Sequence, residues 1–180
     1  MKKPLLIVLI LVVVALVAFL GLRSYTKSFS PEAVAEYNKN GLQVAVQYSR
    51  PSKKSRLIFG REQDNALVPY DKVWRTGANE ATTIQFAQDV LFAGKPVKAG
   101  QYTLWTIPGP ARWKVILNRE VGQWGTNYND GQDLFRSDVD IRIQPKVAEK
   151  FAIYFEDQPE GTAMILQWDQ TEVIVPIRPK

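Results

Sequence analysis

Residues 73–82, with the sequence VWRTGANEAT, contain the densest group of chemically capable side chains in this sequence. The guanidinium of Arg75, the amide of Asn79 and the carboxylate of Glu80 surround a glycine there, and one interpretation is a pocket that hydrogen-bonds a sugar or a carboxylate. The other interpretation is structural: Arg75 and Glu80 pair across a turn, because Gly77 and Asn79 both tolerate left-handed backbone angles. The structural interpretation is favoured, since ion-pair networks often imitate active sites.

A second group of candidate residues is aromatic, because sugars and apolar ligands stack on exposed indole rings. The sequence contains five tryptophans: Trp74, Trp105, Trp113, Trp124 and Trp168. Trp105, Trp113 and Trp168 lie on expected strands, and we expect them to fill the core. Trp124 lies in a long loop that runs to about Ser137, and long loops in compact domains are often functional. Trp124 therefore joins Arg75, Asn79 and Glu80 as a candidate ligand-binding residue.

The sequence contains no cysteine and no histidine. Ser-His-Asp and Cys-His catalysis are therefore excluded, together with disulfides and most zinc sites. What remains for an enzyme is a pair of carboxylates in the manner of a glycosidase, and the 18 acidic residues do not indicate which pair. No catalytic residue can be named from the sequence.

The stretch NYNDGQD at residues 127–133 resembles a calcium-binding loop. If Gly131 takes the sixth position of such a loop, Thr126, Tyr128 and Ser137 take the first, third and last positions. Those positions require carboxylates or amides, so the register does not fit calcium. We predict no metal site and no cofactor.

The net charge of +5 is concentrated at the N-terminus. Lys2, Lys3, Arg23 and Lys27 are four of the 23 basic residues, which leaves 19 basic against 18 acidic side chains in the rest of the chain. A nucleic-acid-binding surface needs a surplus of lysine and arginine on the domain itself, so we predict no nucleic-acid partner.

Residues 5–22 form an uninterrupted apolar run, LLIVLILVVVALVAFLGL. With Pro4, a helix over this run is about 28 Å long at ~1.5 Å per residue, close to the ~30 Å hydrocarbon core of a bilayer. The competing interpretation is a cleaved signal peptide, whose apolar region usually spans about 7–15 residues before a small-x-small cleavage site. The length of the run, and the lack of such a pair of small residues near its end, favour an uncleaved membrane anchor at residues 4–22.

The orientation of this anchor follows from its flanking charges. Lys2 and Lys3 indicate a cytoplasmic N-terminus, although Arg23 and Lys27 beyond the other end nearly cancel the asymmetry. We predict a single-pass protein of the cell membrane, with its domain on the extracytoplasmic side.

Beyond the anchor, apolar and polar residues alternate in short runs. A turn signal at residues 38–41 precedes an alternating run at residues 42–48, which predicts a hairpin, although Ser30 followed by Pro31 is also typical of the start of a short helix. Further strands are predicted at residues 82–86, 102–107, 113–117, 139–143, 151–155, 163–168 and 172–177, with hairpin turns at 158–161 and 169–171.

Short strands separated by glycine and proline indicate an all-β domain. We predict an antiparallel β-sandwich, with a jelly-roll-like or barrel-like closure as the alternative, preceded by one transmembrane helix. Residues 1–27 form the anchor and its flanks, and residues 28–180 form a single domain.

Several longer motifs together resemble a known family. They are YSRPS at 48–52, RLIFG at 56–60, LVPYDKVWRTGANEAT at 67–82, AGQYTL at 99–104, WTIP at 105–108, WKVILN at 113–118 and WG at 124–125. With these motifs the chain resembles the bacterial domain-of-unknown-function family 2911 over about residues 30–177. The resemblance implies an exported or envelope protein, and it implies no activity for any residue.

The sequence thus favours a membrane-anchored envelope protein that binds a glycan or a protein partner without catalysis. A purely structural domain without a ligand is a second hypothesis. The alternative from another class is a carboxylate-dependent enzyme that acts on envelope carbohydrate.

Overall fold

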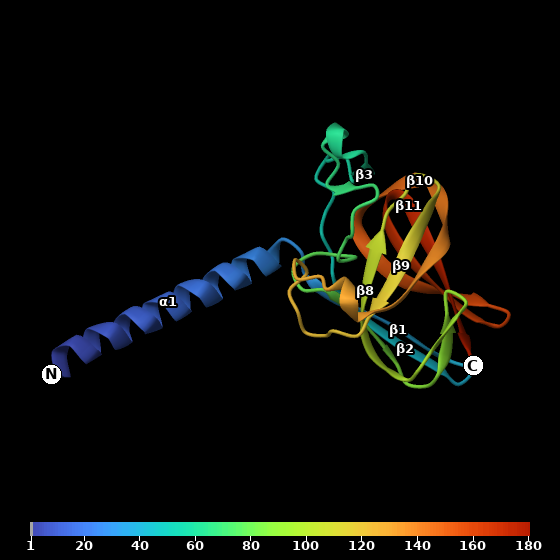
Figure 1. Cartoon of the computed structure of the whole chain (residues 1–180). Helices are drawn as coiled ribbons and strands as arrows, with labels where there is room; N and C mark the ends of the chain where they lie inside the picture. Colours follow the sequence, from blue (N-terminus) through green and yellow to red (C-terminus); the bar gives the residue numbers. More distant parts are fainter. Residues whose placement is uncertain (1) are drawn as a thin grey trace.

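One long helix precedes eleven strands in the computed structural model, which describes residues 2–180 (Figure 1). Met1, the first residue of the expected anchor segment, lies outside the described residues. The elements are α1 (Lys2–Ser28), β1 (Glu32–Lys39), β2 (Leu42–Ser49), β3 (Phe59–Gly60), β4 (Val68–Pro69), β5 (Thr82–Phe86), β6 (Val90–Phe92), β7 (Lys95–Val97), β8 (Gly100–Ile107), β9 (Arg112–Asn118), β10 (Asp133–Gln158) and β11 (Gly161–Pro179). Two short 3-10 helices, η1 (Glu62–Asp64) and η2 (Asp130–Gln132), complete the chain.

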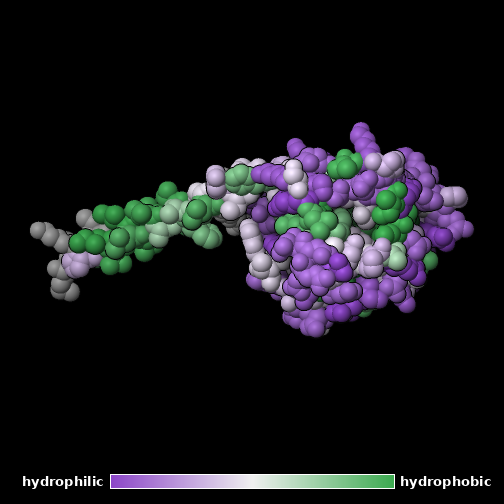
Figure 2. Space-filling model, turned by 90° about the horizontal axis from the view of Figure 1, so that it is seen from above, coloured by the Kyte–Doolittle hydropathy of each residue, from purple (hydrophilic) through white to green (hydrophobic). Residues whose placement is uncertain are grey.

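The helix α1 extends away from the body and exposes its apolar side chains, which Figure 2 shows as a nearly continuous hydrophobic surface. Its segment Ile7–Ser28 is long and apolar enough to cross a bilayer. A signal sequence near an N-terminus has the same length and composition, so the structure establishes a helix of membrane-span length.

The chain changes from helix to strand at Pro31. A proline cannot donate a backbone hydrogen bond and disfavours helical angles at the residue before it, so α1 ends at Ser28 and β1 begins at Glu32. The alternative of a short helix over residues 30–37 is therefore wrong, and the predicted hairpin is confirmed by the antiparallel pairing of β1 with β2. Asn40 and Gly41 form its turn with φ of 52° and 75°, the left-handed angles of a tight hairpin.

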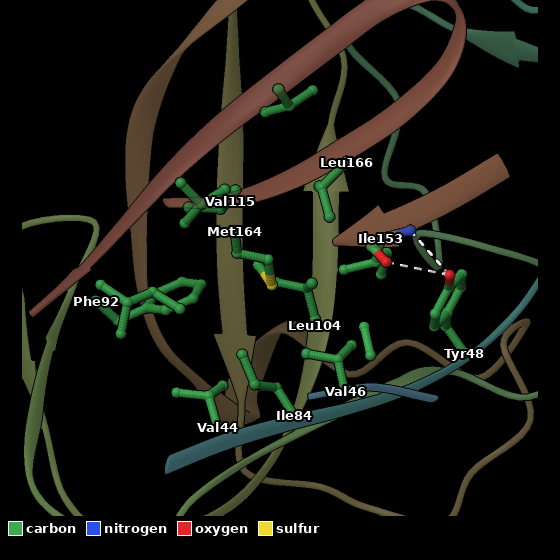
Figure 3. Close-up of a cluster of buried hydrophobic side chains, with 14 of the residues drawn as sticks. Val44, Val46, Tyr48, Ile84, Phe92, Leu104, Val115, Ile153, Met164 and Leu166 are labelled. Carbon is green, nitrogen blue, oxygen red and sulfur yellow. Dashed lines mark hydrogen bonds between the residues drawn. The ribbon is translucent and has the colours of Figure 1, made fainter. Parts of the chain in front are cut away.

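Nine strands form one sheet in the order β1-β2-β5-β8-β9-β10-β11-β6-β7, and each neighbouring pair is antiparallel. Within residues 2–180 the edge strands β1 and β7 do not pair with each other, so the sheet is not a closed barrel. It folds over on itself instead, and Tyr48 of β2 joins the two halves. The Tyr48 hydroxyl accepts a hydrogen bond from the Ile153 backbone N–H (2.9 Å) and lies 3.3 Å from the Ile153 carbonyl (Figure 3). The predicted all-β, sandwich-like class is confirmed.

The C-terminal strands are longer than the sequence predicted. The four strands expected at residues 139–143, 151–155, 163–168 and 172–177 are two continuous strands, β10 and β11, of 26 and 19 residues. The turn at residues 158–161 is confirmed, since Gln158 pairs with Gly161. The turn predicted at residues 169–171 is wrong: β11 continues through Asp169, whose φ is 55°, where the pairing with β10 shifts register. Turn-forming residues also suit such an irregularity, because a bulge needs one residue outside the extended region.

An aromatic cluster fills the space between the two halves of the sheet. The Phe59 ring centroid lies 4.7 Å from that of Trp113 and 6.1 Å from that of Trp168. Trp105, Trp113 and Trp168 are 1%, 2% and 1% exposed, so their predicted place in the core is confirmed. Trp74 belongs to the same cluster and stacks on Trp168 at 5.9 Å.

One carboxylate is buried on β11 within a complete set of donors. Glu172 is 3% exposed and receives hydrogen bonds from Arg142 (2.6 Å), Gln144 (2.6 Å), Tyr154 (2.8 Å) and Gln167 (2.9 Å). Burial alone would raise the pKa of Glu172, but the hydrogen bonds outweigh burial and hold the pKa below its ordinary value of 4.5. A carboxylate with a lowered pKa stabilises the fold when it is ionised.

We predict that Glu172→Gln lowers the free energy of unfolding by about 2–4 kcal/mol at pH 7, because amide and guanidinium donors then lose a charged acceptor. The stabilisation is fully present above the ordinary glutamate pKa and is lost as pH falls through the lower pKa of the folded state. Urea unfolding should therefore show the two proteins converging as pH falls below the ordinary glutamate value of 4.5. Glu160→Gln, at an exposed glutamate paired with Arg178, is the control and should change stability little. An equal effect of the two substitutions would contradict this role of Glu172.

Candidate functional site

The turn at residues 74–80 is fixed by the core. Trp74 Nε1 donates a hydrogen bond to the carbonyl of Gly77 (3.1 Å), and the Thr82 hydroxyl donates to the carbonyl of Thr76 (2.8 Å). Thr76 and Asn79 have φ of 53° and 60°, in the left-handed region that side chains rarely adopt. Packing of Trp74 therefore holds an otherwise unfavourable backbone in one conformation.

Arg75 is half-buried, and the ion pair predicted between Arg75 and Glu80 is wrong. Its guanidinium Nη1 lies 3.5 Å from the carbonyl oxygen of Asn79, the long limit of a hydrogen bond. Burial lowers the pKa of Arg75, and no carboxylate among the described residues lies close enough to offset this effect. A partly desolvated cation without an anion is unfavourable for the fold, so this arginine is not explained by stability alone.

Glu80 pairs instead with the end of the helix. Lys27, in the last turn of α1, lies 2.9 Å from a Glu80 oxygen and 2.6 Å from a Glu32 oxygen. One ammonium group thus lies between two carboxylates that come from β1 and from the turn. This arrangement joins the helix directly to the candidate site.

The Trp124 loop packs against the same turn. Trp124 forms an isolated antiparallel β-bridge with Glu80, and the Gly125 N–H donates to the carbonyl of Asn79 (3.0 Å). A Cβ atom at Gly125 would overlap the Arg75 side chain and lie 2.7 Å from the Asn79 oxygen. Only glycine fits there, so the loop backbone rests directly on the arginine stem.

The four predicted residues meet at one corner of the body without lining one pocket. Arg75 and Asn79 line a cavity of about 370 Å³, here named the arginine cavity. Glu80 lines a second cavity, also of about 370 Å³, together with Glu32 and Gln123. Trp124 is among the lining residues of neither cavity and remains half-buried at their junction.

Several residues of the arginine cavity escaped the sequence analysis. Its wall includes Lys54, Arg56 and Trp168, and its edge includes Phe29 and Ser30, which directly follow α1. These residues are distant in sequence from Arg75, and no local pattern relates any of them to it. Only the fold brings them together.

Metal binding has no support in the arrangement of acidic side chains. Within residues 2–180, no group of three or more acidic side chains is placed to hold a metal ion.

Comparison with protein families matches residues 30–177 to the family described as "Protein of unknown function (DUF2911)". The chain therefore belongs to this family, as its motifs indicated. No curated protein matches the chain, and no solved structure matches it.

We predict that Arg75→Met changes the free energy of unfolding by less than about 1 kcal/mol, because the substitution keeps apolar packing and removes a buried charge that lacks an anion. The matched control is Arg142→Met, which removes the charged partner of buried Glu172 and should destabilise by about 2–4 kcal/mol. Thermal and urea melts measure both. A loss of about 3–5 kcal/mol in Arg75→Met would instead show that Arg75 is a structural residue.

Proposed function

We propose that this protein is a membrane-tethered, non-catalytic binding module of the bacterial cell envelope. Residues 1–27 are its uncleaved anchor, and residues 28–180 are a single domain on the extracytoplasmic side. The apolar helix α1 supports membrane attachment, and the two lysines at positions 2 and 3 support a cytoplasmic N-terminus. The nearly neutral domain argues against nucleic acid.

The observation that carries the binding function is Arg75. A half-buried guanidinium at the wall of a cavity, with no carboxylate partner in the part of the chain that the structure describes, is arranged to meet an anionic or hydrogen-bonding group from outside the chain. We therefore place the ligand, a glycan or a protein partner, at the corner formed by Arg75, Asn79, Glu80 and Trp124. The rigid turn and the packed loop keep these groups in position before binding, which reduces the entropy lost on binding.

The second candidate, a carboxylate-dependent enzyme acting on envelope carbohydrate, has one specific observation in its favour. Glu32 and Glu80 line one cavity and contact the same ammonium group, so two carboxylates are close together as a glycosidase requires. However, Lys27 fills the space between them, where a glycosidic oxygen would have to lie. The binding function is therefore preferred.

We predict that the full chain fractionates with membranes and needs detergent, and that a truncated protein of residues 28–180 is soluble and folded without it. Mass spectrometry of the full-length protein from cells should find the N-terminal segment intact. A chain that begins after Leu22, or that is found in the soluble fraction, would show that the segment is a cleaved signal.

We also predict that the full chain in detergent binds a component on a glycan array or in an envelope extract, and that Arg75→Met reduces this binding at least about tenfold. Glu80→Gln, measured for hydrolysis of envelope glycans, tests the enzymatic alternative: loss of a real activity in this variant would favour the enzyme. Empty results from both the array and the extract would favour a purely structural domain.

A further inference from the structure

The arginine cavity carries positive charge without matching negative charge. Arg75, Lys54 and Arg56 line it, whereas no aspartate or glutamate does. A cavity wall with one sign of charge attracts small ions of the opposite sign, because low-dielectric walls concentrate the field.

The three cations differ in how far contacts within the chain already occupy them. Arg56 is committed to the chain, since its Nε and Nη2 groups donate to the carbonyls of Lys53 (3.0 Å) and Ser52 (2.5 Å). Lys54 Nζ lies 4.9 Å from the centroid of the Phe29 ring at the edge of the cavity. Among the described residues Arg75 makes only the 3.5 Å contact to Asn79, so most of its donors remain available for a ligand.

A second donor in the cavity wall also lacks an acceptor. Trp168 is 1% exposed, and its buried indole N–H has no hydrogen-bond partner among the described residues. Trp74, which stacks on it, satisfies its own N–H with the carbonyl of Gly77. A buried donor without an acceptor is rare in folded proteins and calls for an explanation, such as a ligand.

A larger cavity of about 480 Å³ shows the contrast. Its arginines are neutralised, since Arg112 pairs with Asp140 (3.1 Å) and Arg178 pairs with Glu160 (2.6 Å). These exposed pairs leave no cation without an anion there. The uncompensated positive charge of the arginine cavity is therefore not found in this larger cavity.

We infer that the arginine cavity binds an oxyanion, a carboxylate or a phosphate, carried by an acidic glycan. This inference rests on the proposed binding function and adds the chemical class of the ligand. Arg75 makes the direct contact, because a guanidinium fork matches the paired oxygens of either group. Lys54 and Arg56 add long-range attraction.

The test uses the full chain in a non-ionic detergent and isothermal titration with glucuronate, glucose and inorganic phosphate. Glucuronate and glucose differ chiefly in one carboxylate, so their comparison isolates the charge. We expect glucuronate or phosphate to bind at least about tenfold more tightly than glucose, and more weakly as salt is raised. The anion that binds identifies the group.

Variants assign the binding to the cavity. Arg75→Met should raise the Kd of the anion at least about tenfold, and Arg75→Lys should recover part of the affinity because an ammonium keeps the charge but loses the fork. Arg61→Met, at an exposed arginine paired with Asp64 outside this cavity, is the matched control and should bind like wild type.

Two results would overturn the inference. In the first, neither anion binds more tightly than glucose; in the second, Arg75→Met binds the anion as well as wild type. Other results would reject the anion inference but keep the proposed binding function. These are glucose binding that depends on Arg75, or a protein partner that is captured only when Arg75 is present. If no binding of any kind depends on Arg75, both the anion inference and the proposed binding function are rejected.

Discussion

The fold of the strand-rich body depends on the burial of one aromatic cluster. Phe59, Trp74, Trp113, Phe151 and Trp168 pack with ring centroids 4.7–6.1 Å apart. Each such ring buries on the order of 150–250 Å², so leaving the cluster open to water would cost several kcal/mol per ring. The nine-stranded sheet alone does not bury this cluster. The segment between β2 and β5 supplies Phe59 and Trp74, two of the five rings, and buries the rest.

The segment between β2 and β5 that buries this cluster also forms the candidate site. Since Trp74 is fixed in the core and its indole holds the carbonyl of Gly77, the turn that follows cannot relax, and Arg75 stays at the cavity wall. The loop backbone at Gly125 also lies directly against the arginine stem. An arrangement that is locally unfavourable and held by the surrounding core is typical of functional residues, because selection for stability alone would remove it.

Much of the fold could be predicted from the sequence, because two-residue alternation and turn residues report directly on local structure. The β1–β2 hairpin, the strands β5, β8 and β9 and the core tryptophans follow from such local signals, whereas the short strands β3, β4, β6 and β7 were not predicted. The continuity of β11 through Asp169 could not be predicted, since the same residue suits a turn or a bulge and only pairing with β10 decides between them. The partner of Glu80 was missed for a related reason: the choice between Arg75, five residues away, and Lys27 depends on where the helix meets the body.

The connection between helix and body fixes the candidate site relative to the end of α1. Lys27 bonds to Glu32 and Glu80, and the Asn79 side chain donates to the carbonyl of Ser30 (3.4 Å), so the residues that form the candidate site also hold the end of α1. If α1 crosses the bilayer as proposed, its last residue, Ser28, lies six residues beyond Leu22, about 9 Å at ~1.5 Å per residue. The headgroup layer is only about 5–8 Å thick on each side. The arginine cavity then faces the aqueous layer just outside the headgroups, which favours a glycan held near the membrane surface over the lipid itself.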